Sequence, residues 1–144
     1  MNKIKVSIGN DHAGTSLKKS IIDHLKNEID FINHGTDDTD SVDYPDFVHP
    51  VAIDIEKGVS TFGILICGSA NGVCMTANKH QGIRAGLAWN SEVAALIKEH
   101  NNANVICIPA RFLTENEALH VLNTYMNEEF EGGRHQNRID KIPC

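Results

Sequence analysis

This sequence of 144 residues lacks two features that would assign it to a membrane or to nucleic acid. No stretch approaches the roughly 18 consecutive apolar residues that a membrane-spanning helix requires. Positive charge is also scarce, because 13 Lys and Arg stand against 19 Asp and Glu, giving a formal net charge of -6. Neither nucleic acid nor an anionic membrane is therefore an expected partner. The first residues, MNKIKVSIGN, are typical of a strand rather than a signal peptide, so we expect a cytoplasmic protein.

Cysteine is scarce too, with four in the chain. No two of them form a C-x-x-C pair, and their spacing matches neither a zinc site nor a disulfide framework. Cys107 lies in the strand-like run NVICIP and is expected to pack in the core, whereas Cys144 ends the sequence and is expected to be exposed. The sequence therefore predicts no metal site.

Three phosphate-binding signatures are missing. Neither G-x-G-x-x-G nor a Walker G-K-[S/T] loop occurs, so no nucleotide cofactor is expected. A low-molecular-weight phosphatase would need arginine six residues after its cysteine, and the residue six positions after Cys67 is Val73.

What the sequence does contain is a regular alternation of strand and helix patterns. Strands are predicted at 3–9, 29–35, 61–67, 82–88 and 103–109, and helices at 14–28, 47–57, 72–79, 91–101 and 114–130. Pro50 is expected in the first turn of its helix, Ser91 as an N-cap, and Thr114 with Glu117 as a capping box. The length suits one domain, residues 1–144. The prediction is a three-layer α/β/α Rossmann-like sandwich with a five-stranded parallel sheet and a C-terminal helix plus tail.

In such sheets ligands bind beyond the carboxyl ends of the strands. Three polar stretches fall there: NDHAG after the first strand, CGSANG after the third, and Arg111 after the fifth. We expect them to converge.

Cys67 has two interpretations. As the last residue of a buried strand it could simply be a small apolar side chain, since free cysteine is among the most buried residue types. The loop that follows, Gly68 to Gly72, can instead turn into a helix whose N–H groups cradle an anion and favour a thiolate. A thiol protease would be geometrically compatible. Proton transfer next to a carbonyl fits better, because it needs one base, one oxyanion cradle and no cofactor.

Two histidine-containing segments are further candidates. Asp11 and His12 follow the first strand, where Asp11 could orient a sugar hydroxyl and His12 could face a phosphate, although a surface role is the default. His100 and Asn101 end the fourth predicted helix, where a C-terminal cation and an asparagine cap explain them adequately. Only its context makes His100 a candidate acid or base.

Arginine is concentrated rather than spread. The chain has only four, and Arg134 and Arg138 would share one face of a helical turn in the tail. Guanidinium groups grip phosphate in bidentate fashion, so this segment is a candidate anion site. A solvated tail is the alternative.

Six stretches taken together carry a resemblance: NDHAG, DYPD, ILICGSANG, TANKHQGIRA, EHNNANV and EGGRHQNR. They span nearly the whole chain, in the order found in the ribose-5-phosphate isomerase B family. This family also holds galactose-6-phosphate isomerase subunits, and the sequence resembles its members throughout.

The resemblance implies an aldose–ketose isomerase of the pentose phosphate pathway that interconverts ribose 5-phosphate and ribulose 5-phosphate. Cys67 would be the base and His100 would help to open the sugar ring. The remaining implied contacts are to the sugar (Asp11, Tyr44), to the enediolate (Gly68, Ser69, Ala70, Asn71, Gly72) and to the phosphate (His12, Arg111, Arg134, Arg138), and Asn101 would bind substrate. The family works without metal or nucleotide, as dimers with sites built from both chains; a tetramer is the alternative assembly.

The chain departs from the family pattern at position 70, where alanine replaces a common glycine, so the loop is expected to be stiffer and the pocket narrower. Another branch of the family uses a glutamate soon after the loop, but Val73 and Cys74 stand there, which leaves Cys67 as the evident base. Two other functions remain open. One is isomerisation of a six-carbon sugar phosphate such as allose or galactose 6-phosphate, and the other is a non-catalytic sugar-phosphate-binding subunit. A redox thiol protein is more distant, because Cys67 lacks a C-x-x-C partner.

Overall fold

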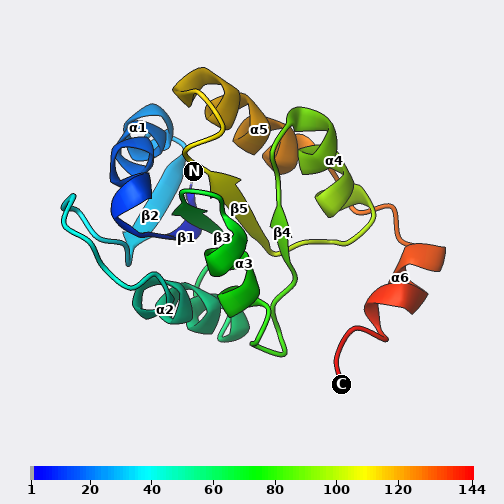
Figure 1. Cartoon of the computed structure of the whole chain (residues 1–144). Helices are drawn as coiled ribbons and strands as arrows, with labels where there is room; N and C mark the ends of the chain where they lie inside the picture. The colour runs from blue at the N-terminus through cyan, green and yellow to red at the C-terminus, as the bar shows by residue number, and fades with distance from the viewer. Residues whose placement is uncertain (1) are drawn as a thin grey trace.

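The computed structural model describes residues 2–144, and its helices and strands alternate along the chain (Figure 1). The strands are β1 (Ile4–Asn10), β2 (Ile29–Asn33), β3 (Phe62–Cys67), β4 (Ala85–Leu87) and β5 (Val105–Pro109). The helices are the 3-10 turn η1 (His12–Gly14), then α1 (Thr15–Leu25), α2 (Pro45–Glu56), α3 (Asn71–Ala77), α4 (Ser91–Glu99), α5 (Glu115–Asn127) and α6 (Arg134–Ile139).

The five strands form one sheet in the order β2-β1-β3-β5-β4, and every neighbouring pair is parallel. The chain passes from β1 outward to β2 and then returns to place β3 on the other side of β1. The order therefore reverses between β1 and β3, and ligands of open α/β sheets bind at such a switch point. Asp11 follows β1 and Gly68 follows β3. Because these strands are neighbours in the sheet, the two residues lie side by side at its carboxyl edge.

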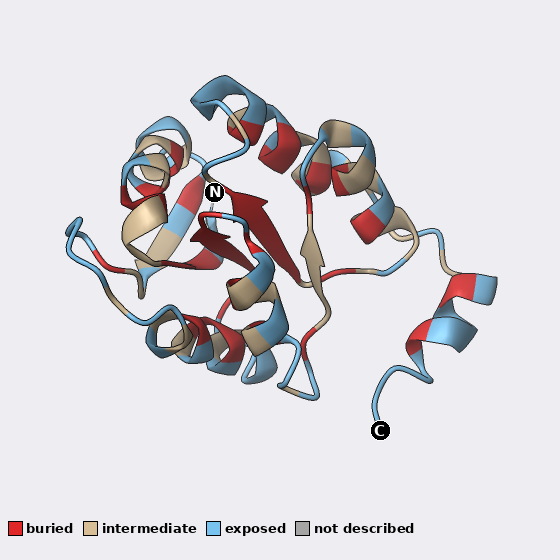
Figure 2. Cartoon of the chain, viewed as in Figure 1, coloured by how far each residue is buried: buried red, intermediate tan, exposed pale blue. Residues whose placement is uncertain are grey.

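Helices cover both faces of the sheet (Figure 1). Successive side chains of a strand point to opposite faces, so β3 sends Ile64 and Ile66 to one side and Leu65 and Cys67 to the other. The first side packs against α1, α4 and α5, and the second against α2 and α3. All six residues of β3 are buried, as Figure 2 shows for the central strands. The predicted three-layer α/β/α architecture is confirmed.

Two local predictions were wrong. The second helix begins at Pro45, so Pro45 takes the first helical position and Pro50 lies inside the helix. Proline tolerates the first position, where its missing N–H is not needed, whereas Pro50 removes one N–H donor from the middle of the helix. The fully buried Val48, Val51 and Ala52 hold α2 on the sheet on both sides of it.

The second correction concerns the start of α4. Its N-cap is Asn90, whose Oδ1 accepts a hydrogen bond from the Val93 N–H at 2.8 Å, and Ser91 is the first helical residue. The capping box at Thr114 and Glu117 is confirmed, with both reciprocal hydrogen bonds present.

The last helix, α6, lies to one side of the sandwich, beyond the edge strand β4 (Figure 1). Its first residue, Arg134, follows two glycines in the left-handed region, Gly132 at φ 71° and Gly133 at φ 58°, which reverse the chain after α5. None of the helices within residues 2–144 is both long and apolar enough to span a bilayer.

The cap assignment predicts unequal effects of two neighbouring substitutions. Asn90→Ala should lower the free energy of unfolding by about 0.5–2 kcal/mol, because the Val93 N–H loses its side-chain acceptor. Ser91→Ala is the matched control and should change it by less than about 0.5 kcal/mol, since alanine suits a helical position. Urea unfolding followed by circular dichroism measures both. A larger loss from Ser91→Ala than from Asn90→Ala would contradict the assignment.

Candidate active site

The junction between β3 and α3 is the centre of the predicted site. Cys67 ends β3 and is only 6% exposed. Its carbonyl oxygen accepts the Ala110 N–H at 2.9 Å, and the next carbonyl, of Gly68, accepts the Arg111 N–H at 3.0 Å. On the other side the Asp11 N–H donates to the Ile66 carbonyl at 3.2 Å. Backbone hydrogen bonds thus fix the segments after β1 and β5 on either side of Cys67.

The segment from Gly68 to Gly72 turns tightly from β3 into the first residues of α3. Ala70 adopts the left-handed conformation at φ 63°, and its side chain is fully buried in the core beneath the turn. Left-handed backbone costs a non-glycine residue about 1–2 kcal/mol, but a buried methyl group returns about 0.8 kcal/mol. The Ser69 hydroxyl accepts the Asn71 N–H at 3.3 Å. Burial of the Ala70 methyl therefore offsets part of the cost of its left-handed backbone.

Two long side chains lie directly against the turn. The Arg111 side chain passes over Gly68. A Cβ added to Gly68 would lie only 3.1 Å from it. The Tyr44 ring lies against Gly72, where a Cβ would come within 2.3 Å of the ring. Gly72 is therefore required for this close approach. Tyr44 and Arg111 flank the loop, as expected if both belong to one site.

His12 and Asp11 occupy the adjacent strand end. The Asp11 carboxylate accepts the Ala13 N–H at 3.0 Å, which caps η1. Nδ1 of His12 accepts the Val42 N–H at 3.2 Å, so the neutral ring carries its proton on Nε2. Buried Lys18, which binds the Thr36 carbonyl at 2.5 Å, anchors the segment that leads to Val42.

The other cysteines differ from Cys67 in their surroundings. Cys107 is fully buried, and burial, together with hydrogen bonding to Cys74, raises the pKa of its thiol well above the usual value. The pKa of the half-buried Cys74 is lowered by its hydrogen bond with Cys107, although burial acts in the opposite direction. Cys107 is a core residue and Cys144 is exposed, as predicted. Cys67 is the cysteine at a strand end beside the glycine-containing turn.

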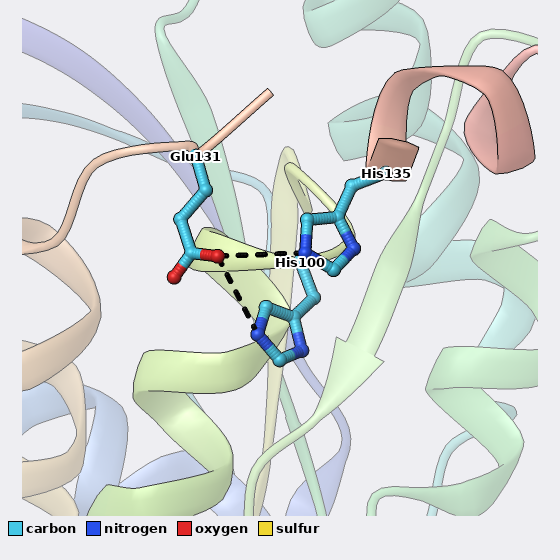
Figure 3. A group of neighbouring side chains, drawn as sticks. All are labelled: His100, Glu131 and His135. Carbon is cyan, nitrogen blue, oxygen red and sulfur yellow. Dashed lines mark ion pairs between the residues drawn. The ribbon is translucent and has the colours of Figure 1, made fainter. Parts of the chain in front are cut away.

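A second group of predicted residues gathers around the end of α4. His100 is the C-cap of α4, and with Asn101, Arg138 and His135 it lines a pocket of about 270 Å³. The His100 and His135 rings stack with centroids 4.3 Å apart and planes at 13°. Both Nε2 atoms face one oxygen of Glu131, at 3.8 Å for His100 and 3.4 Å for His135 (Figure 3). The pKa of the neighbouring Glu99 is raised, chiefly by hydrogen bonding to Glu128.

Arg134 and Arg138 are both exposed, one helical turn apart in α6, so the predicted helical turn forms in the tail. Arg84, the remaining arginine, has a structural role. Its guanidinium donates to the Asn102 carbonyl through Nε at 3.1 Å and Nη2 at 3.0 Å, which fixes the loop between α4 and β5.

The two groups lie at opposite ends of the sheet. Cys67 pairs with Pro109 at the carboxyl end of β5, whereas His100 precedes Val105, where β5 begins. Those four residue steps alone separate the ends by about 13 Å at about 3.3 Å per residue. Within one chain the structure therefore brings Asp11, His12, Tyr44 and Arg111 to Cys67. It brings Asn101 and Arg138 to His100, and it does not bring His100 to Cys67.

Sequence reasoning missed Glu131 and His135 as neighbours of His100. Both stand in EGGRHQNR, where only the arginines are candidate ligands in the sequence. Their separation of four residues was visible, but their approach to α4 depends on the turn at Gly132 and Gly133 and on a hydrogen bond from the Glu131 N–H to the Glu99 carbonyl at 3.0 Å. The two glycines signal a change of direction in the sequence, but neither the direction of the turn nor this hydrogen bond can be read from it.

Known proteins resemble this chain over nearly its full length. The family model described as Ribose/Galactose Isomerase matches residues 6–142. The probable ribose-5-phosphate isomerase B of Mycoplasma genitalium is 45% identical over 142 residues, which are 95% of this chain and 92% of that protein. The ribose-5-phosphate isomerase B of Escherichia coli is 35% identical, with 96% and 93% covered.

Solved structures agree with these sequence relatives. A ribose 5-phosphate isomerase of Thermotoga maritima superposes with a TM-score of 0.95 at 38% identity, covering 99% of each chain. Ribose-5-phosphate isomerase B of Mycoplasma genitalium with bound ribulose-5-phosphate superposes at 0.92 and 44% identity, covering 96% of this chain and 93% of the other. The fold and the cysteine at the end of β3 agree with these matches. The chain belongs to the ribose/galactose isomerase family.

Proposed function

We propose that this chain is an aldose–ketose isomerase that interconverts ribose 5-phosphate and ribulose 5-phosphate. The observation that carries the proposal is the position of Cys67, a thiol at the switch point of the sheet beside a turn that ends in a helix N-terminus. The family membership and the ribulose-5-phosphate bound to the Mycoplasma genitalium relative support this substrate.

In the proposed mechanism the Cys67 thiolate removes the proton from C2 of the open-chain aldose and returns it to C1. The intermediate is an enediolate, whose negative oxygens are stabilised by N–H groups of the turn from Gly68 to Gly72. A positioned base typically contributes about 10²–10⁴-fold to the rate. Asp11 and Tyr44 hold the sugar hydroxyls. Binding the distant phosphate keeps C1 and C2 at the thiolate.

We further propose that the complete site forms between two chains of a homodimer. His100, which assists ring opening, lies about 13 Å or more from Cys67 along the strand direction of its own chain. Asn101 and Arg138 share its pocket, so a partner subunit would deliver all of them together to Cys67. His12 and Arg111 would hold the phosphate from one chain, and Arg134 and Arg138 from the other.

The choice of base predicts that Cys67→Ala abolishes isomerisation and exchange of the C2 proton with solvent, while the fold and the affinity for substrate persist. Stopped assays with ribose 5-phosphate and deuterium exchange followed by NMR measure these quantities. Cys107→Ala is the matched control. It should lower stability, because Cys107 is fully buried, and leave turnover nearly unchanged. Wild-type exchange at C2 in Cys67→Ala would exclude this thiol as the base.

The substrate assignment predicts a preference among three phosphorylated sugars. Ribose 5-phosphate should be converted with a higher kcat/KM than allose 6-phosphate or galactose 6-phosphate, when all are assayed side by side. Unphosphorylated ribose should be a poor substrate, because the arginines then have no ligand. A higher kcat/KM with a six-carbon sugar phosphate would assign the chain to that reaction, and binding without any turnover would indicate a non-catalytic subunit.

The shared site predicts that two inactive variants rescue each other. Cys67→Ala and His100→Ala are mixed, dissociated and allowed to reassociate. Random pairing makes half of the dimers mixed, and each mixed dimer holds one intact site of two, so activity should rise to about a quarter of wild type. Mixing Cys67→Ala with Arg111→Ala is the control. Both residues lie in the same half-site. Each mixed dimer therefore has one site with the Cys67→Ala change and one with the Arg111→Ala change, so no site is intact and activity should not recover. No recovery in the first mixture, with subunit exchange confirmed by native mass spectrometry, would contradict a shared site.

A further inference from the structure

The residues around His100 form a set of metal ligands that the sequence did not predict. His100 from the end of α4, Glu131 from the segment before α6 and His135 from α6 bring one donor atom each into a single cluster, in which both imidazoles face the Glu131 carboxylate (Figure 3). These donor atoms all lie within 4.8 Å of one another, the one such group of three among residues 2–144. Glu131 and His135 are four residues apart in the sequence, whereas His100 is distant from both.

The backbone holds this set together. The Glu131 N–H donates to the Glu99 carbonyl at 3.0 Å, which ties the segment before α6 to the last turn of α4. The His135 N–H donates to the Gly132 carbonyl at 3.2 Å, so the left-handed glycines place His135 back over Glu131. The His135 side chain is only 10% exposed, whereas those of His100 and Glu131 are 39% and 52% exposed. The backbone therefore keeps the three residues close together, and the side chains of His100 and Glu131 are open to solvent.

The distances suit a small divalent ion. Zinc binds imidazole nitrogen and carboxylate oxygen at about 2.0–2.2 Å, so the corners of a tetrahedral site lie about 3.3–3.5 Å apart. The separation of His135 Nε2 from Glu131 Oε1 is 3.4 Å, and that of His100 Nε2 from the same oxygen is 3.8 Å. Because the His100 and His135 rings stack nearly parallel, one imidazole must turn out of the stack before both rings and Glu131 can hold one ion. Two imidazoles and one carboxylate favour zinc over magnesium or calcium, which prefer oxygen ligands.

We propose that His100, Glu131 and His135 bind a zinc ion with three protein ligands and an open coordination position. The positive charge of Arg138, which lines the same pocket, weakens cation binding there. The nearby carboxylates of Glu99 and Glu128 strengthen it. The ion is not needed for the proposed isomerisation. It occupies Nε2 of His100, the nitrogen that faces Glu131, and so competes with the role of this ring in opening the sugar.

The binding test uses zinc in competition with a chromophoric zinc chelator, on full-length protein carrying Cys67→Ala and Cys144→Ala so that neither thiol takes the metal. One zinc ion should bind per chain. Glu131→Gln and His135→Gln should each weaken binding by at least about tenfold, the scale on which even outer-shell partners act.

The matched control is His80→Gln. His80 lies 3.0 Å from Glu56 and 2.7 Å from His49. The substitution therefore removes an imidazole that also neighbours a carboxylate and a second histidine, but in another part of the surface. Zinc affinity should not change in this variant. Equal affinity in all the proteins, or a loss confined to His80→Gln, would overturn the proposal. Cobalt provides a second measurement without substitution at the site. Bound cobalt should show a visible absorption band that zinc abolishes, and the absence of any band contradicts the site.

The effect on activity rests on the proposed function and is tested with Cys67 intact. Zinc should inhibit the wild-type isomerase reversibly, and a chelator should restore its activity. Each protein is compared with its own metal-free rate, and Glu131→Gln should require at least about tenfold more zinc for the same fractional inhibition. Equal inhibition of both proteins would assign the effect to the Cys67 thiol and overturn control through His100. Zinc binding as expected by a protein without any isomerase activity would leave the metal site standing and remove the proposed function instead.

Discussion

The packing of β3 between β1 and β5 is the constraint on which the rest of the candidate site depends. A strand that is buried on both faces and paired on both edges has one position and one register. Its last residue, Cys67, is fixed as a consequence. Because all the strands are parallel, the segments that leave β1 and β5 emerge beside it, and their backbone hydrogen bonds to Ile66, Cys67 and Gly68 leave them little freedom. The thiol is thus held by a rigid part of the fold while the side chains around it come from loops.

The same topology separates the two halves of the site. A helix that follows a parallel strand runs back along the sheet, so α4 carries His100 to the amino ends of the strands. No rearrangement of side chains can bring this histidine to Cys67 in the same chain. If the proposed function holds, two half-sites at opposite ends of one subunit require an assembly in which each subunit completes its partner, which is a geometric reason for a dimer.

The extension after α5 gives the second half-site its character. Through Gly132 and Gly133 the chain turns into α6 at the side of the sandwich (Figure 1), where His135 and Arg138 share a pocket with His100 at the end of α4. His100 and His135 share a pocket with Arg138, so the proposed phosphate site and the proposed zinc site overlap at His100. Competition between the two ligands would follow from this overlap alone.

The sequence by itself determined the alternation of strands and helices, the parallel sheet and the position of Cys67 at a strand end, because apolar periodicity and turn residues are local signals. It also indicated the capping box at Thr114 but not the Asn90 cap, since Asn90 and Ser91 are both suitable cap residues and only the backbone conformation distinguishes them. The order of the strands, the left-handed conformation of Ala70 and the stacking of His135 on His100 were decided by tertiary structure. Each depends on contacts between segments far apart in the chain, where packing of buried surface outweighs the preference of any single residue.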